Sequence, residues 1–231
     1  MRFVLTIILC SFLTIGVSAQ HANLFLGNSY STNLNYLIYN DDYHTAFKPI
    51  IKSDLKFDVD SILELNSQSD YSNWYLRKFF SEHFILLKGN GYRVFASPII
   101  DFSKGKEFLD EKNTFTNTRG FVVEGDLDKR ISFFSSFTEN QSIFPNYIDA
   151  HIRDNRVVPG QGYSRDFKET GFDYAMSSGY VSYRANKMFV VQFGHGKNFI
   201  GDGYRSLLLS DNSFNYPYLR IQTTFWKVQY T

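Results

Sequence analysis

The sequence predicts an all-β protein, and more narrowly a partial antiparallel transmembrane β-barrel with a small N-terminal helical portion. Three observations predict this class. Aromatic residues make up 18% of the 231-residue chain, with 24 Phe and 16 Tyr. The mean hydropathy is -0.27, and after the N-terminus no stretch is apolar enough to cross a bilayer as a helix. From residue 91 onward, apolar and polar side chains alternate over segments long enough for tilted, membrane-spanning strands.

Residues 1–19 are predicted to be a signal peptide. Arg2 supplies a positive charge, and the run FVLTIILCSFLTIGV has the length of a signal-peptide apolar core. The small residues VSA at 17–19 lie where a signal peptidase cleaves, so the mature chain is expected to begin at Gln20. A membrane anchor is the alternative, but the apolar run is short and a polar segment follows it.

The cysteine content and the charge balance exclude several classes of protein. Cys10, the only cysteine, is followed by more apolar residues and does not fit a lipoprotein cleavage site. The expected mature chain therefore has neither a disulfide nor thiol chemistry. The formal net charge of +1 gives no indication of a nucleic-acid partner.

Residues 20–90 mix helical and extended patterns. Apolar residues at helical spacing predict short helices over 31–40 and 70–84, the second with Asp70 as its N-cap. The segment HTAFKPI at 44–50 is predicted to be extended, and its proline restricts it to a sheet edge or a loop.

Six segments after residue 91 have the alternation of strands. They are YRVFASPII, RGFVVEGD, RISFFSSFTEN, FDYAMSSGYVSYR, MFVVQFG and YLRIQTTFWKVQYT. The compact turns LDK and ANK join two pairs of these strands into hairpins. A polar loop is predicted over 101–118, and a long irregular loop over roughly 141–170.

Each predicted strand has one apolar, aromatic face, which is assigned to lipid. In the strand at 172–184 that face would carry Phe172, Tyr174, Met176 and Tyr180. The opposite faces hold Ser, Thr, Gly, Ala and Gln with single charges, a mixture typical of a wet barrel lumen rather than of a surface in bulk water. Charges on the predicted lipid-facing sides stay near strand ends, at Arg119, Glu139 and Lys227. A secreted β-sandwich produces the same alternation and stays an alternative.

The predicted barrel is not complete within this sequence. The chain ends at Thr231, inside or just beyond a predicted strand. Bacterial barrels contain an even number of strands, so the sequence is expected to be the N-terminal part of a longer barrel. Its sheet would otherwise have an open edge, which lipid does not tolerate.

The stretch FGHGKNFIGDGYRSLLLSDNS at 193–213 combines four glycines with charged residues, yet it matches no nucleotide or metal motif. Gly196 and Lys197 are followed by Asn198, which breaks the P-loop pattern, and the Rossmann spacing also fails. His195 has no suitably spaced partner, and the acidic residues lack the spacing of a calcium loop. No metal or cofactor site is therefore predicted.

No catalytic residues are predicted either. The sequence GDGYRS lacks a G-x-S-x-G elbow. Nothing in the sequence places two carboxylates, such as those of Glu139, Asp149, Asp154 and Asp202, across a sugar ring. The glycines of 193–213 instead suit sharp turns and close backbone approach. Its charged residues are expected to pair internally, and SLLLS at 206–210 is expected to provide an apolar footing.

Four segments carry a resemblance to a known family. They are HTAFKPI, NTRGFVVEGDLDKRISFFSSFTENQ, VPGQGYSRDF and the run from DYAMSSGYVSYR to the C-terminus, in which GHGKNFIGDGYRSLLLSD is highly specific. These segments resemble the capsule-assembly Wzi-like outer-membrane protein family, and more closely its gliding-motility-associated RemB-type branch. Members of that family are much longer than this chain.

The resemblance implies the first part of an outer-membrane β-barrel in residues 91–231, preceded by a periplasmic portion in residues 20–90. It implies a lectin-like, non-catalytic protein that organises or anchors surface polysaccharide, with a link to gliding motility. The expected partners are surface polysaccharide, outer-membrane lipid and the barrel-assembly machinery of a Gram-negative bacterium. Two alternatives stay open: an outer-membrane pore without a glycan role, and a secreted β-sandwich binding module.

Nine residues combine the aromatic, amide and charged groups that suit sugar recognition, and each is also a candidate for bracing the lumen or a loop. They are Arg119, Glu139, Asn140, Gln141, Lys197, Asp202, Tyr204, Arg205 and Asp211.

Overall fold

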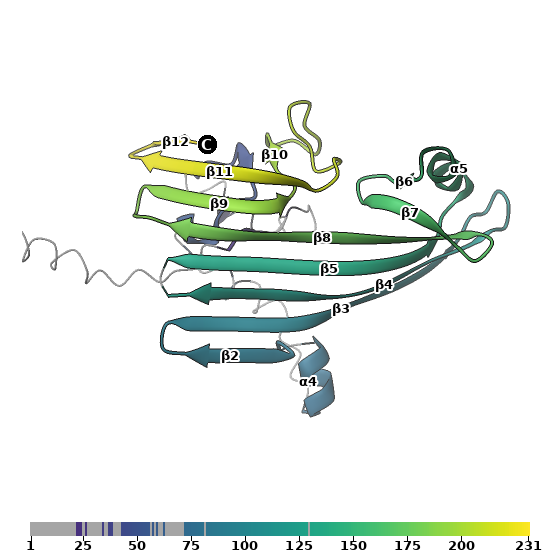
Figure 1. The fold of residues 1–231 in the computed structure, drawn as a ribbon, viewed down its shortest axis with the longest axis horizontal. Helices are drawn as coiled ribbons and strands as arrows, with labels where there is room; N and C mark the ends of the chain where they lie inside the picture. Colours follow the sequence, from purple (N-terminus) through teal and green to yellow (C-terminus); the bar gives the residue numbers. More distant parts are fainter. Residues whose placement is uncertain are drawn as a thin grey trace, which may run out of the picture.

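The computed structural model describes residues 22–24, 26, 34, 37–38, 43–55, 57, 59, 62, 72–80, 82–128 and 130–231. Most of them form one ten-stranded antiparallel sheet (Figure 1), so the protein is all-β, as predicted. The predicted signal peptide lies outside the described residues. No helix in the described ranges is both long enough and apolar enough to cross a membrane.

The strands are β1 (Phe47–Lys48), β2 (Ile85–Gly89), β3 (Tyr92–Lys106), β4 (Asn113–Leu127), β5 (Ile131–Ile143), β6 (Val157–Val158), β7 (Gly162–Phe167), β8 (Gly171–Arg184), β9 (Phe189–Gly196), β10 (Phe199–Ile200), β11 (Tyr216–Phe225) and β12 (Val228–Tyr230). The helical elements are η1 (Lys52–Asp54), α4 (Trp74–Phe80) and α5 (Asn146–Asn155).

The large sheet has the order β12-β11-β9-β8-β5-β4-β3-β2. Strand β7 pairs with the first part of β8, β6 pairs with β7, and β1 and β10 form a separate two-stranded sheet. In the part of the chain that the structure describes, nothing pairs with the outer edge of β2 or of β12, so the sheet is open rather than closed into a barrel. No second large sheet is stacked on it there, as a β-sandwich would require.

The N-terminal predictions are met where the structure describes them. Residues 34, 37 and 38 are helical, while the rest of 31–40 lies outside the described residues. Helix α4 begins at Trp74, and the predicted cap Asp70 is not described; Asn73 Oδ1 instead accepts a hydrogen bond from the Tyr75 amide at 2.9 Å. The extended segment at 44–50 contains β1.

Two predicted loops are wrong. Strands β3 and β4 are 15 residues long and pair through most of 101–118, leaving only 107–112 as a connection. The threonine-rich start of β4 is polar, but β-branched threonine favours extended backbone. The predicted irregular segment 141–170 contains the end of β5, α5, β6 and β7.

Helix α5 forms because its apolar residues meet the end of the sheet. Ile148 and Ile152 are one turn apart and pack with Val158, Phe172 and Tyr174. Ile152 and Phe172 are fully buried. The helix ends where Arg156 adopts a left-handed conformation with φ of 57°.

The connections differ in length between the two ends of the sheet. At one end, on the left in Figure 1, only short turns join the strands: residues 90–91, 128–130, 185–188 and 226–227. At the other end the connections are 107–112, 144–170 with α5, β6 and β7, and 197–215 with β10. We call these the short-turn end and the long-connection end.

Candidate functional site

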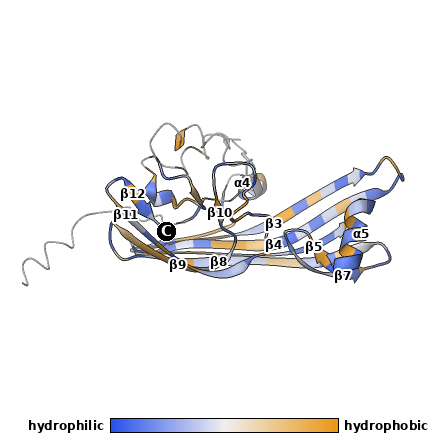
Figure 2. Ribbon diagram, turned by 90° about the horizontal axis from the view of Figure 1, so that it is seen from above, coloured by the Kyte–Doolittle hydropathy of each residue, from blue (hydrophilic) through white to orange (hydrophobic). Residues whose placement is uncertain are grey.

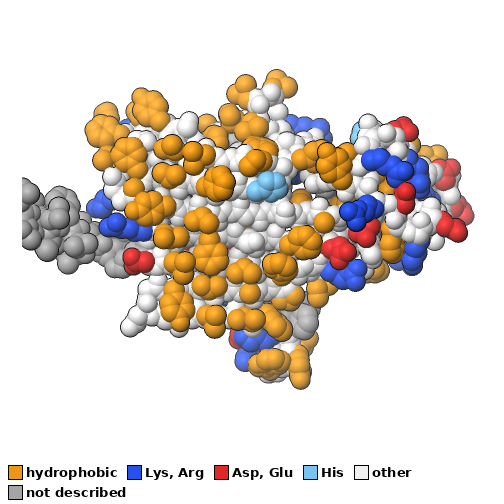
Figure 3. Space-filling model, in the orientation of Figure 1, with side chains coloured by type: hydrophobic (Ala, Val, Ile, Leu, Met, Phe, Trp, Pro, Cys, Tyr) orange, Lys and Arg blue, Asp and Glu red, His pale blue; other side chains and the backbone are white. Residues whose placement is uncertain are grey.

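One face of the sheet is apolar and exposed. In the cross-strand row Leu219, Phe193 and Val181, the side chains are 64%, 66% and 52% exposed. Phe137 and Phe121 lie opposite each other on the same face and are also exposed. Figure 3 shows hydrophobic side chains gathered over the middle of this face, with many of the charged side chains at the long-connection end. We call this surface the outward face.

The opposite, inward face is polar and largely covered. Its buried side chains include Ser132, Ser182, Gln192, Arg220 and Gln222, each no more than 5% exposed. Burying such groups is costly unless they find hydrogen-bond partners. The described N-terminal residues supply many of those partners, and Figure 2 shows them on one side of the curved sheet.

Asn23 joins the N-terminal segment to the middle of the inward face. Its backbone N–H donates to the Tyr180 hydroxyl at 2.7 Å. Its side-chain amide exchanges two hydrogen bonds with the Gln192 amide, at 3.2 and 3.1 Å. The Tyr218 hydroxyl donates to Gln192 Oε1 at 3.1 Å. Asn23 therefore replaces water for two inward side chains, Tyr180 and Gln192.

Asp54 makes a second junction nearer the short-turn end. Arg184 Nη2 donates to Asp54 Oδ1 at 2.6 Å, and Gln222 Nε2 donates to Asp54 Oδ2 at 2.6 Å. Arg220 Nη1 donates to the Pro49 carbonyl at 2.7 Å. Ion-paired and amide contacts thus hold residues 49–54 against β8 and β11.

Between the N-terminal segment and the strands lies a cavity of about 670 Å³. Phe134 and Tyr180 stack in its wall with ring centroids 5.6 Å apart. The Ser136 and Ser178 hydroxyls, 2.8 Å apart, also line it. This combination of aromatic rings and hydroxyls resembles the surfaces that bind sugars, and we call it the central cavity.

Two of the nine candidate residues, Lys197 and Asp211, line the central cavity. Lys197 Nζ donates to the Gly160 carbonyl at 2.6 Å and to the Asp211 carbonyl at 2.9 Å. Burial lowers the pKa of the Lys197 ammonium, and the Asp211 carboxylate acts in the opposite direction. Lys197 thus ties two connections together beside the cavity.

The structure places the candidates from β4 and β5 elsewhere. Arg119 and Glu139 are cross-strand neighbours on the outward face, and Gln141 lies on that face as well. Asn140 is buried on the inward face, where its Oδ1 accepts from Thr118 at 2.8 Å and its Nδ2 donates to the Tyr174 carbonyl at 3.2 Å. Asn140 therefore braces strands and is not open to a ligand.

The remaining candidates belong to the exposed part of the 197–215 connection. Asp202 pairs with Lys48 at 3.1 Å and accepts from Thr45 at 2.8 Å. These partners of Asp202 belong to the N-terminal segment, so the prediction that the charges of this loop pair internally is wrong for Asp202. Arg205 lies over the Tyr204 ring, 5.6 Å from its centroid, and both side chains are exposed.

The glycines have the predicted structural role, whereas the predicted apolar footing is wrong. A Cβ on Gly194 would come within 2.9 Å of the Tyr218 hydroxyl and closer still to Tyr180, so glycine makes room for two cavity aromatics. Gly201 has a φ of 127°. Leu207 and Leu208 are exposed at 105% and 80%, because this loop extends away from the sheet instead of lying on it.

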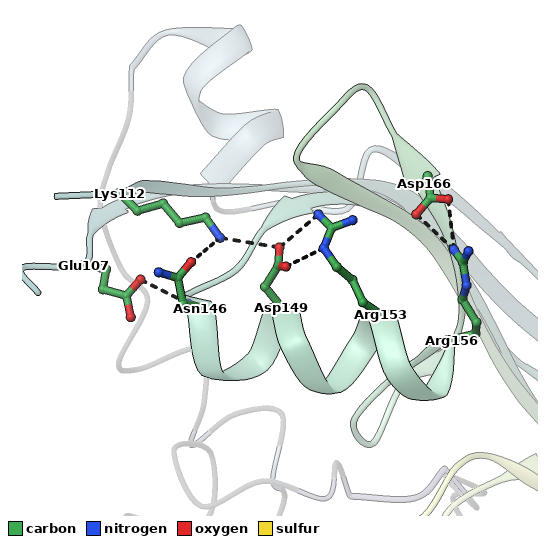
Figure 4. A network of polar contacts seen from close by, with 7 residues as sticks. All are labelled: Glu107, Lys112, Asn146, Asp149, Arg153, Arg156 and Asp166. Atoms are coloured by element: carbon green, nitrogen blue, oxygen red, sulfur yellow. Dashed lines mark hydrogen bonds and ion pairs between the residues drawn. The ribbon is translucent and has the colours of Figure 1, made fainter. Parts of the chain in front are cut away.

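A polar network organises the long-connection end (Figure 4). Asp149 accepts from Arg153 Nε at 2.7 Å and lies 3.4 Å from Lys112 Nζ. Lys112 also donates to Asn146 Oδ1 at 2.8 Å, so the β3–β4 connection is bound to α5. Arg156 pairs with Asp166 at 2.9 Å. These contacts fix α5 at the long-connection end of the sheet.

Sequence reasoning missed the cavity aromatics and hydroxyls. Alternation places Phe134 next to Ser132 and Ser136 on a polar face, where an aromatic side chain breaks the pattern. This break in the alternation was the signal in the sequence that could have identified the cavity, because an aromatic side chain on a polar face needs apolar neighbours such as Tyr180. Within the described ranges, no group of three or more His, Cys, Asp or Glu could hold a metal ion.

No protein-family model matches the chain, and no curated protein or solved structure matches it. The resemblance to the Wzi-like family therefore stays a prediction.

Proposed function

We propose that the chain is a non-catalytic outer-membrane β-protein that holds surface polysaccharide. The observation that carries the membrane part is the polarity of the two faces. The covered face is polar and hydrogen-bonded, whereas the uncovered face is apolar. A soluble sheet usually has the reverse arrangement, because burying apolar area drives folding. Lipid around the outward face accounts for a sheet whose uncovered face is apolar and whose covered face is polar.

The dimensions of the apolar band agree with this proposal. On β3, all the outward side chains from Tyr92 to Phe102 are uncharged. They are Tyr92, Val94, Ala96, Pro98, Ile100 and Phe102. Ten residue steps cover about 33 Å along a strand. At the tilt usual for outer-membrane barrels, this corresponds to about 25 Å across the membrane.

Membrane insertion would also require the two sheet edges to be paired, because unsatisfied backbone groups are expensive in lipid. We infer that further strands cover β2 and β12 in the membrane. Barrels of this kind have short periplasmic turns and longer external connections. In the proposed orientation, α5 and the 197–215 connection therefore face the outside of the cell.

The central cavity is the proposed glycan site. Phe134 and Tyr180 offer aromatic faces, Ser136 and Ser178 offer hydroxyls, and Lys197 adds a charge beside the long connections. The link to gliding motility is supported by the sequence resemblance alone. A pore is less well supported, because the N-terminal segment occupies the inward face; the conductance of the protein in planar bilayers should accordingly be low.

Two measurements test the proposal separately. The full-length protein should stay in the outer-membrane fraction after a carbonate wash, and release by the wash would refute membrane insertion. Purified protein should retain polysaccharide extracted from the same cells. Lys197→Gln should weaken this retention, and Lys168→Gln, which removes an exposed lysine outside the cavity, should not. Equal retention by both variants would refute the glycan site.

A further inference from the structure

We propose that a second cavity, at the short-turn end of the inward face, binds a phosphate-bearing ligand. This cavity has a volume of about 810 Å³ and lies between residues 43–54 and strands β8, β11 and β12. Its size falls within the usual range for small-ligand sites. The inference concerns a different cavity from the glycan site and does not depend on that proposal.

The lining of this cavity is strongly cationic. Four cationic side chains, Arg184, Lys187, Arg220 and Lys227, share the wall with one carboxylate, that of Asp54. Asp54 is already paired with Arg184 at 2.6 Å. The cavity therefore keeps an excess of positive charge after its own acid is counted.

Arg220 is the central observation. Arg220 is only 5% exposed, yet among the described residues no carboxylate forms an ion pair with its guanidinium group. Its guanidinium donates to the Pro49 carbonyl and, at 2.5 Å, to Gln222 Oε1, and it lies over the Phe47 ring. Its Nε has no hydrogen-bond partner in the described structure. A buried cation without a counter-charge is costly, so an anion in the cavity would stabilise it.

The other cations are placed to complete the site. Arg184 is held by Ser53 and Asp54, and Asp54 in turn accepts from Gln222, the neighbour of Arg220. The two arginines therefore belong to one hydrogen-bonded network. Lys187 and Lys227 lie on two separate short turns and are exposed, and neither forms an ion pair among the described residues.

The chemistry of these groups favours phosphate. Guanidinium groups bind phosphate oxygens through paired, charge-assisted hydrogen bonds, and lysines add mobile positive charge. Tyr43, Phe47 and Trp226 line the same cavity and give it an apolar wall. This wall suits the rest of a phosphorylated molecule. The phosphate could belong to a soluble compound or to a phospholipid headgroup.

Isothermal titration of the full-length protein in neutral detergent tests the site. One arm uses inorganic phosphate, and the other compares short-chain phosphatidylglycerol with phosphatidylcholine of the same chain length. We expect inorganic phosphate to bind. Tighter binding of phosphatidylglycerol than of both phosphate and phosphatidylcholine would identify a headgroup as the source, and binding of phosphate alone would identify a soluble ligand. Binding of neither anion would overturn the proposal.

Variants distinguish a local site from the overall charge. Lys187→Gln with Lys227→Gln should weaken phosphate binding by about tenfold or more, since charged hydrogen bonds are lost. Arg220→Lys keeps the charge but loses the guanidinium geometry, and it should weaken binding as well. The matched control is Lys104→Gln with Lys168→Gln, which removes two exposed lysines that do not line the cavity. Equal weakening by this control would refute a specific site.

Discussion

Val181→Arg should strongly destabilise the protein in a membrane. Val181 lies on the outward face of β8, between Phe133 and Phe193 in the neighbouring strands, and is 52% exposed. An arginine facing lipid costs up to about 2–4 kcal/mol, the value at the bilayer midplane. This cost corresponds to a decrease of about 30- to 1,000-fold in the ratio of folded to unfolded protein. At an exposed position in water, the same change would usually stay within about 0.5 kcal/mol.

Ala175→Arg is the matched control for this substitution. Ala175 lies on the same strand and the same face, but its cross-strand neighbour is Glu139. An arginine opposite a glutamate is worth about 0.2–1 kcal/mol in favour of the sheet. Both variants of the full-length protein would be compared by urea titration in phosphatidylcholine vesicles. A Val181→Arg protein as stable as the wild type, or an equal loss in both variants, would refute the assignment of the outward face to lipid.

Three further predictions follow from the contacts. Asp54→Asn should lower the free energy of unfolding by about 1–3 kcal/mol and expose the N-terminal segment to protease, because two charged hydrogen bonds weaken; unchanged protease resistance would contradict the role of this junction. Burial lowers the pKa of Lys197 in the folded protein, so between that pKa and 10.5 the unfolded chain binds more protons than the folded protein. The free energy of unfolding, measured by urea titration, should therefore rise with pH across this range, and Lys197→Met should abolish the rise. The predicted mature chain has no cysteine, so single cysteines can be introduced at Asp173 and at Val181. In vesicles, a membrane-impermeant thiol reagent should modify the Asp173→Cys variant and not the Val181→Cys variant. Equal modification of both would count against a lipid boundary between the two positions.

The sequence alone was enough to predict which residues share a face in β4 and β11. Phe121 and Val123 share a face of β4, and Leu219 and Ile221 share a face of β11, as alternation predicted. The period of two in a strand fixes which residues share a face, whatever the neighbouring strands are. The order of the strands and the pairing of β1 with β10 could not be predicted in this way, because they depend on residues far apart in the chain.

The covering of the inward face also escaped prediction. By composition, serine, glutamine and arginine on one face indicate the lining of a wet lumen. Water and a hydrogen-bonding segment satisfy such side chains equally well, so composition does not separate the two. In the structure, Gln192 and Gln222 bond with Asn23 and Asp54 of the N-terminal segment. The partners come from more than a hundred residues away, and nothing local identifies them.

Strand β8 shows where the assignment of faces by composition fails, and the failure supports the membrane proposal. The four side chains of β8 that were assigned to lipid all lie on the inward face: Phe172 and Tyr174 pack beside α5, and Met176 and Tyr180 line the central cavity. Asp173, which was assigned to the lumen, lies on the outward face together with Val181 and Tyr183. The apolar side of this strand thus changes from the outward to the inward face along its length. A sheet wholly in water has no reason to make that change. A strand that leaves lipid and enters water does, because the apolar residues must face lipid within the membrane and the protein interior beyond it.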